Sequence, residues 1–405
     1  MNKSDFPIFT NHPELVYLDN AATSQKPSIV INAIQDFYEK SNSNVHRGIH
    51  KLAEESTILY ENSRSTIAKF IGAKPEEIIF TSGTTESLNL IADMLGQYFG
   101  TSAKTKTILL TELEHHSNIL PWQKIADILK WKIDYVNIDN NYSLDIQDLD
   151  YRLRTLDVSI ISLTNMSNVT GSIVPLEEIG KLVKSKSPET LIVVDGAQYV
   201  PHHKIDLSQL PEIDFYAFSG HKMMGPTGIG VLYGKEELLT KLNPTKLGGG
   251  MISKVEREHS TYANLPEKFE AGTPNISGAI ALASAIDYII NEITEDDINK
   301  LYNLTQYSLT TLLSIPELTV LGPQASENRG PVFSFSIKNI HPHDVAQYLD
   351  NDNIAIRAGH HCTQLLHREV FNLPATARAS LYYYNEKDDI DKLIASIKKL
   401  ITTFK

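Results

Sequence analysis

The chain has 405 residues, of which 41% are hydrophobic, so it is long enough for two domains with cores of ordinary size. Acidic residues outnumber basic residues by 49 to 37, and a formal net charge of -12 disfavours binding to nucleic-acid backbones and anionic membranes. No apolar stretch reaches the roughly 18 residues of a membrane helix, and the N-terminus lacks a signal-peptide pattern. We therefore expect a cytoplasmic protein that acts on small molecules.

The first half of the chain alternates between two patterns. Short runs rich in Val, Ile and aromatic residues are separated by stretches of helical period, which predicts an α/β domain with a mostly parallel sheet between helices. The predicted strands are Glu77–Thr81, Thr107–Thr111, Ile133–Ile138, Ser159–Thr164, Leu191–Asp195, Phe215–Ser219 and Gly230–Tyr233. The predicted helices between them include Thr85–Leu95, Pro121–Lys130 and Leu176–Lys186.

The last third of the chain has a different organisation. A long Ala/Ile-rich helical stretch begins near Ile276, and we interpret it as the crossing into a smaller C-terminal domain. In that domain the patterns predict strands at Val332–Ile337 and Ile354–Arg357, and helices at Pro342–Leu349 and Ile390–Phe404.

A turn of small polar residues, Thr81 to Thr85, lies between the first predicted strand and the following helix. Free backbone N–H groups and hydroxyls at a helix N-terminus form a ready site for a phosphate. An ordinary helix cap accounts for most turns of this kind, so the turn alone does not establish a binding site.

Two charged residues follow apolar strands at the edge where open α/β sheets bind ligands. Asp195 ends one strand, and Lys222 comes shortly after another. Alone, the first could be a turn residue and the second a solvated surface lysine. A desolvated lysine, however, can lose its proton and form a Schiff base with an aldehyde. With the phosphate turn, these residues supply what pyridoxal 5′-phosphate requires: a phosphate anchor, a carboxylate for the pyridine nitrogen and an amine for C4′.

Several motifs in the same order resemble those of the Suf-type cysteine desulfurases, within the class V aminotransferases. They are Tyr17-Leu18-Asp19-Asn20-Ala21-Ala22, Thr111-Glu112-Leu113-Glu114-His115-His116, Val194-Asp195-Gly196-Ala197-Gln198, Ser219-Gly220-His221-Lys222, Arg357-Ala358-Gly359-His360-His361-Cys362 and Arg378-Ala379-Ser380. The resemblance implies the type I fold of pyridoxal-phosphate enzymes, with a seven-stranded, mostly parallel sheet. It also implies three parts: residues 1–20 packing with the small domain, a large domain of residues 21–275, and a small α/β domain of residues 276–405.

The same resemblance implies roles around the cofactor. Lys222 would form the imine, Asp195 would pair with the pyridine nitrogen, Gln198 would bond the ring oxygen, and His115 would stack on the ring. The implied phosphate ligands are Thr84, Thr85, Ser219 and His221, with Thr273 reaching the site from the partner subunit of a homodimer.

Substrate recognition is implied in the same way. Arg378 would grip the carboxylate of L-cysteine, which suits the fixed fork of a guanidinium, with Asn168 assisting. Arg357 would lie near the substrate, and His46 and Arg47 would sit in a loop that approaches the site.

Cys362 is the only cysteine, which excludes an internal disulfide. It follows Gly359-His360-His361 in a polar loop, and its thiolate would be a nucleophile, whereas the alternative is an inert core cysteine. We predict that Cys362 takes the sulfur of L-cysteine as a persulfide and releases alanine. The sulfur would pass to an acceptor of the SufU or SufE type for iron–sulfur cluster assembly. The loop after Cys362 lacks the proline usual in the family and is one residue longer, which leaves the acceptor open.

Three other readings remain. A metalloprotein is suggested by pairs such as His202-His203, but no recognised zinc spacing occurs, and we predict no metal site. A non-catalytic binding module gives no reason for Lys222, Asp195 and Cys362 to occur together. A class V aminotransferase or a selenocysteine lyase would share the cofactor residues, and Cys362 is the discriminating feature.

His343 could supply a zinc ligand in a complex with a zinc-carrying acceptor.

Overall fold

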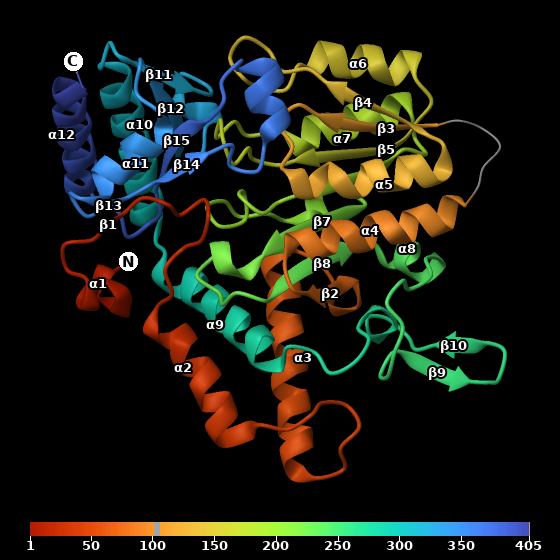
Figure 1. Cartoon of the computed structure of the whole chain (residues 1–405). Coiled ribbons are helices and arrows are strands. Elements are labelled where there is room, and N and C mark those ends of the chain that lie inside the picture. Colours follow the sequence, from red (N-terminus) through yellow and green to blue (C-terminus); the bar gives the residue numbers. More distant parts are fainter. Residues whose placement is uncertain (101–105, 405) are drawn as a thin grey trace.

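The structure, a computed structural model, describes residues 1–100 and 106–404. Its centre is a seven-stranded sheet in the order β2-β8-β7-β6-β5-β3-β4 (Figure 1). All seven predicted strands are confirmed, with ends that differ by at most two residues: β2 (Ile78–Thr81), β3 (Thr107–Thr111), β4 (Lys132–Val136), β5 (Val158–Thr164), β6 (Leu191–Asp195), β7 (Phe215–Ser219) and β8 (Gly230–Gly234). Only β8 runs antiparallel to its neighbours, so the carboxyl ends of the other six strands meet at one edge.

Helices cover both faces of this sheet, as predicted, because its strands are apolar on both sides. In β6, Ile192 and Val194 join one core while Val193 joins the other. The first core is closed by α3 (Lys51–Ile71), α6 (Ile146–Thr155), α7 (Leu176–Lys186) and α9 (Ile276–Glu292). The second is closed by α4 (Thr84–Phe99), α5 (Leu120–Leu129) and α8 (Glu236–Lys241).

The C-terminal part has its own antiparallel sheet in the order β11-β12-β15-β14. Its strands are β11 (Leu318–Leu321), β12 (Val332–Ile337), β14 (Arg357–Gly359) and β15 (Thr376–Ser380), and α10 (Glu295–Leu313), α11 (Pro342–Asp350) and α12 (Lys387–Phe404) pack with it. The predicted single strand 354–357 is wrong. Residues 354–355 form β13 (Ile354–Ala355), which pairs in parallel with β1 (Val16–Tyr17), while β14 belongs to the other sheet.

The N-terminal segment packs into the core of the C-terminal part. Phe6 and Phe9, next to and inside α1 (Pro7–Asn11), are buried there together with Val16 and Leu18. Helix α9 contributes to both cores, with Leu282 in the sheet core and Ala285 in the C-terminal core. The division at residue 276 therefore stays a prediction, because this helix belongs to both packing units.

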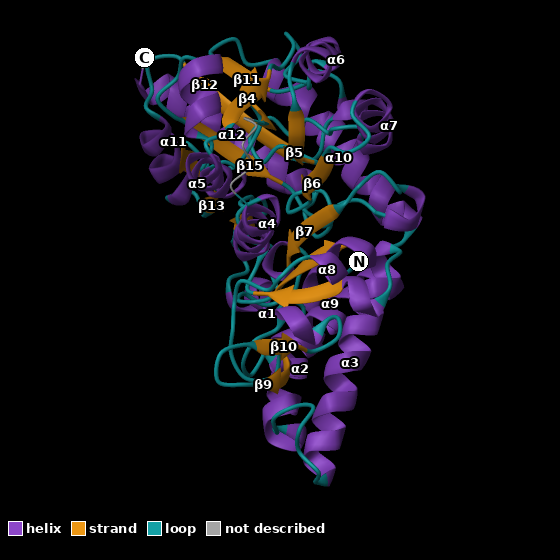
Figure 2. Cartoon of the chain, turned by 90° about the vertical axis from the view of Figure 1, so that its right-hand side faces the viewer, coloured by secondary structure: helices purple, strands orange, loops and turns teal. Residues whose placement is uncertain are grey.

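Helix α2 (Ser28–Asp36), the N-terminal half of α3 and the hairpin of β9 (Ile252–Val255) and β10 (Ser260–Tyr262) project from the body of the molecule (Figures 1 and 2). Several large apolar side chains on this projection are exposed, including Ile49 (98% exposed), Leu52 and Ile58. Among the described residues, no single helix has the length and apolar composition to span a membrane.

Candidate active site

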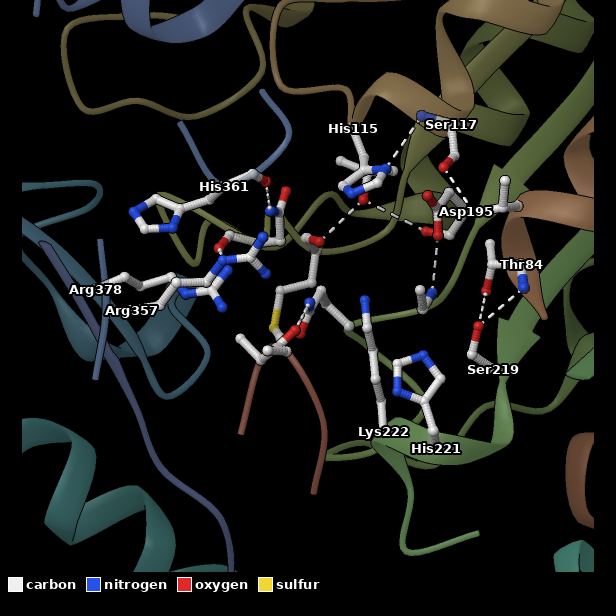
Figure 3. A pocket seen from close by; sticks show the side chains of 18 residues that line it. Thr84, His115, Ser117, Asp195, Ser219, His221, Lys222, Arg357, His361 and Arg378 are labelled. Atoms are coloured by element: carbon white, nitrogen blue, oxygen red, sulfur yellow. Dashed lines mark hydrogen bonds between the residues drawn. The ribbon is translucent and has the colours of Figure 1, made fainter. Parts of the chain in front are cut away.

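A cavity of about 180 Å³ opens at the sheet edge where the strand carboxyl ends meet. Most of the predicted site residues line it together, from both the sheet and the C-terminal part (Figure 3). Its lining residues are Ala21, Ala22, Thr84, Thr85, His115, Ser117, Thr164, Met166, Asn168, Asp195, Ala197, Gln198, Ser219, His221, Lys222, Arg357, His361 and Arg378.

Lys222 lies in a 3-10 turn, Gly220–Lys222, directly after β7, and its amine extends into the cavity (Figure 3). Burial lowers the pKa of Lys222 to about 8, against the opposing effect of the Asp195 carboxylate. The positive charges of Arg378 and Arg357 act in the same direction as burial and contribute to this lowered pKa. About a tenth of the amine is therefore uncharged at pH 7, far more than for an exposed lysine, and condensation with an aldehyde requires this form.

Asp195 is the last residue of β6, beside β7, and its side chain is buried. One carboxylate oxygen accepts the N–H of Ala197 at 2.9 Å. Burial raises the pKa of Asp195, while that hydrogen bond and the Lys222 charge oppose the rise. No side-chain donor in the described residues bonds this carboxylate, so a protonated ring nitrogen fits as its partner.

The predicted phosphate turn is confirmed as a turn at the N-terminus of the 16-residue helix α4. The backbone N–H of Thr84 donates to Ser219 Oγ at 2.9 Å, and the two hydroxyls lie 2.7 Å apart. Gly83 has φ 153°, and a Cβ on the facing Gly230 would lie 2.4 Å from the Gly83 Cα, so the two backbones approach as only glycines allow. Hydroxyls and a positive helix end at this place suit a phosphate.

Two further predicted cofactor residues face the same cavity. His115 Nδ1 accepts the Ser117 N–H at 3.1 Å, and burial, with Lys222 nearby, lowers the pKa of His115 to about 3. The imidazole is therefore neutral, and the proton lies on Nε2. Gln198 donates from Nε2 to the carbonyl of Ala21 at 2.7 Å, which ties the N-terminal segment to the cavity wall.

Two arginines enter the cavity from the C-terminal sheet, where Arg357 on β14 is the direct cross-strand partner of Arg378 on β15. Arg378 is 1% exposed, and its Nη1 and Nη2 donate to the Asn168 carbonyl at 3.0 Å and to Asp19 at 3.1 Å. Burial lowers the pKa of Arg378, and the Asp19 charge opposes this effect. Two guanidiniums held side by side form a suitable site for a carboxylate.

Cys362 lies at the rim rather than among the lining residues, one position after His361. Its side chain is partly exposed, and its sulfur lies 3.9 Å from Nη2 of Arg357. Asn168 Nδ2 donates to the carbonyl of His361 at 2.7 Å and so fixes the start of the loop. The polar loop predicted around the thiol is confirmed. Because the side chain of Cys362 is partly exposed, the alternative of an inert core cysteine is wrong.

Besides Cys362, three predicted residues do not line this cavity. His46, Arg47 and Thr273 line a separate hollow of the same subunit, near the projecting part of the molecule. All three are exposed, and His46 Nε2 contacts Glu61 at 2.8 Å. The action of Thr273 in the site of a partner subunit therefore stays a prediction. The predicted approach of His46 and Arg47 to the substrate site also stays a prediction, because neither residue lines the cavity of its own subunit.

Some site residues had no predicted role. The hydroxyl of Ser117 lies 2.7 Å from the hydroxyl of Thr85 and is hydrogen-bonded to it. Its position two residues after His115 could have indicated that Ser117 belongs to the site. Glu114 is buried behind the cavity, where it accepts the N–H of Thr164 at 2.9 Å, and burial raises its pKa to about 8. The sequence carries no signal for Glu114, because the burial and the hydrogen-bond partners of this carboxyl arise only in the folded chain.

The fold and the cavity define an α/β enzyme of the type that holds pyridoxal phosphate on a lysine. The family comparison agrees: residues 16–393 match the model described as "Aminotransferase class-V", and the chain belongs to that family. Among distant folds, a C-DES variant solved with glycine covalently linked to its PLP cofactor is 22% identical, with a TM-score of 0.82. The predicted fold and the predicted cofactor, pyridoxal 5′-phosphate, are confirmed at the level of this family.

Closer relatives cover nearly the whole chain. A protein of Halalkalibacterium halodurans described as a probable cysteine desulfurase is 46% identical over 98% of this chain and 96% of its own length. One from Streptomyces coelicolor with the same description is 43% identical over 99% and 97%. The solved cysteine desulfurase of Thermococcus onnurineus is 38% identical over 99% and 97%, with a TM-score of 0.92.

Proposed function

We propose that this protein is a Suf-type cysteine desulfurase that converts L-cysteine to L-alanine and holds the sulfur as a persulfide on Cys362. One observation carries the proposal: the only cysteine of the chain lies at the rim of the cavity that contains Lys222, with its sulfur 3.9 Å from a cavity arginine. The descriptions of the closer relatives support the same reaction.

Each part of the chain has a defined task in this reaction. Arg378 and Arg357 bind the carboxylate of cysteine and orient it. When bound, pyridoxal phosphate withdraws electrons from the substrate Cα. Lys222, whose pKa burial lowers to about 8, takes and returns the proton at that carbon. His115 stays neutral and presents its Nε2–H to the cavity.

The thiolate of Cys362 then attacks the sulfur of the bound cysteine. An S–S bond forms, the C–S bond breaks, and its electron pair goes to the substrate carbon, which takes a proton to give alanine. Sulfur remains on Cys362 as a persulfide. We propose that an acceptor of the SufU or SufE type removes it for iron–sulfur cluster assembly in the cytoplasm, with His343 available to a zinc-carrying partner.

The decisive experiment mixes the purified enzyme with cysteine and a reductant and assays alanine and sulfide. We expect wild type to form both and Cys362→Ser to form neither, while intact mass without reductant shows one added sulfur atom on wild type only. Lys222→Ala is the matched cofactor control. Alanine formation by Cys362→Ser at the wild-type rate would refute the persulfide route. Activity of that variant with selenocysteine alone would favour the selenocysteine lyase.

We further propose a homodimer in which Thr273 reaches the phosphate site of the partner subunit. Two observations support it. Thr273, His46 and Arg47 lie together outside the cavity of their own subunit, and the nearby projection exposes Ile49, Leu52 and Ile58. Apolar surface of this kind is typical of a face that another subunit covers.

A further inference from the structure

His116, next to the predicted ring-stacking residue, holds the loop that carries Cys362. Its backbone N–H donates to the carbonyl of Cys362 at 2.8 Å. Its side-chain Nε2 accepts the backbone N–H of Gln364 at 2.9 Å. One residue therefore bonds the loop at the thiol-bearing position and again two residues after it.

The loop needs such support because its backbone has an uncommon shape. His361 and Cys362 both have positive φ, 51° and 59°, a region that non-glycine residues rarely occupy. Such conformations persist only where the surroundings impose them. Asn168 bonds the preceding carbonyl, of His361, so His116 and Asn168 tether residues 361, 362 and 364 together.

The histidine side chain is suited to this contact only when it is uncharged, because the acceptor is a ring lone pair. Partial burial, with a further effect of His360, lowers the pKa of His116. The imidazole is thus neutral at physiological pH and can accept the Gln364 N–H. His116 lies in the 3-10 turn His116–Asn118, directly after His115, so the turn that faces the cofactor also holds the nucleophile loop.

We propose that His116 is a positioning residue that fixes the Cys362 loop against the turn bearing His115, so that the thiol and the cofactor face keep a set separation. The proposal rests on the proposed role of Cys362 in sulfur transfer. It assigns His116 no contact with substrate or cofactor.

The test uses three variants of the full-length, cofactor-loaded enzyme. His116→Ala removes the acceptor, while His116→Gln places an amide oxygen where Nε2 was. His360→Ala is the matched control: this exposed ring lies 5.9 Å from the ring of His367 and makes no hydrogen bond within the described residues. Hydrogen exchange measured by mass spectrometry on peptides spanning residues 361–366 reports on the loop without substrate.

We expect exchange in these peptides to be about three- to tenfold faster in His116→Ala, the range that loss of one hydrogen bond produces. His116→Gln and His360→Ala should stay near wild type. Alkylation of Cys362, the sole thiol, should accelerate in the same variant, and kcat should fall with little change in KM. Equal exchange in His116→Ala and His360→Ala would overturn the proposal.

The outcome is separable from that of the proposed function. Exchange and alkylation are measured without turnover, so they report on the loop even if Cys362→Ser still forms alanine. Conversely, a persulfide on Cys362 together with unchanged exchange in His116→Ala would retain the desulfurase and discard the positioning role.

Discussion

At the scale of single residues, the site is defined by groups whose ionisation the fold has changed. Asp195 ends β6 and Lys222 follows the adjacent parallel strand β7, and burial alone would disfavour the charge of each residue. Their attraction limits the change. Both residues were predictable, because strand ends in open α/β sheets are where ligands bind. Glu114 was not predictable, because its importance depends on tertiary burial.

Asp195→Asn should shift the pH dependence of cofactor binding. The carboxylate raises the pKa of Lys222, so its removal should lower that pKa below about 8, and the reactive neutral amine should persist to lower pH. In wild-type apoenzyme, the rate of pyridoxal phosphate uptake should rise through pH 8 and then level off. Absorbance stopped-flow between pH 6 and 9.5 measures both midpoints. Identical midpoints would contradict the coupling.

At the scale of elements, a buried ion pair joins the long helix to the strand that leads into the phosphate turn. Arg64 of α3 donates to Glu270 at 2.7 and 2.9 Å and to the carbonyl of Ile78 in β2 at 2.8 Å. Glu270 also accepts the Phe80 N–H at 2.8 Å. The network therefore connects β2 to the segment that contains Thr273.

Removing Glu270 should leave the buried Arg64 charge with one carboxylate partner, the part-exposed Glu61 at 2.9 Å. We expect Glu270→Gln to lower the free energy of unfolding by about 2–3 kcal/mol, because Glu61 still pairs with Arg64; urea denaturation at fixed protein concentration measures this change. The double variant Arg64→Met/Glu270→Gln should recover part of that loss. If the loss of stability in the double variant equals the sum of the losses in Glu270→Gln and in Arg64→Met, the two side chains are not coupled.

The strands of the central sheet were predictable because they are short apolar runs buried on both faces. The antiparallel direction of β8 was not, because strand direction depends on pairing rather than on composition. The pattern 354–357 is continuous in sequence but is divided between two sheets, since Ala355 pairs with Tyr17 and Arg357 with Arg378. The β9–β10 hairpin is largely exposed and carries little hydrophobic signal.

At the scale of the whole molecule, a single subunit holds the cavity and, elsewhere, Thr273, the residue predicted to complete the site of a neighbouring subunit. The motif order in the sequence predicted which residues act together, and the resemblance implied that Thr273 acts in the site of the partner subunit. The structure places Thr273 outside the cavity of its own chain. That separation follows from the path of the chain between β8 and α9.

Mixing two inactive variants tests the shared site directly. Lys222→Ala and Thr273→Ala subunits, unfolded together and refolded as a mixture, should regain up to about a quarter of wild-type activity, since half of the dimers are mixed and each has one intact site. Each variant refolded alone is the control, and light scattering gives the mass of the species. No recovery in a mixture that is dimeric would exclude the action of Thr273 across subunits.

The register of β14 and β15 sets two like charges against each other. Arg357 and Arg378 are direct cross-strand partners, an arrangement that costs stability in any sheet, and Asp19 offsets only part of it. Repulsion between these two guanidiniums is therefore expected to destabilise the small sheet when no anion is bound. Binding of a small carboxylate between the two guanidiniums would offset their repulsion, so a bound carboxylate should raise the melting temperature of the protein.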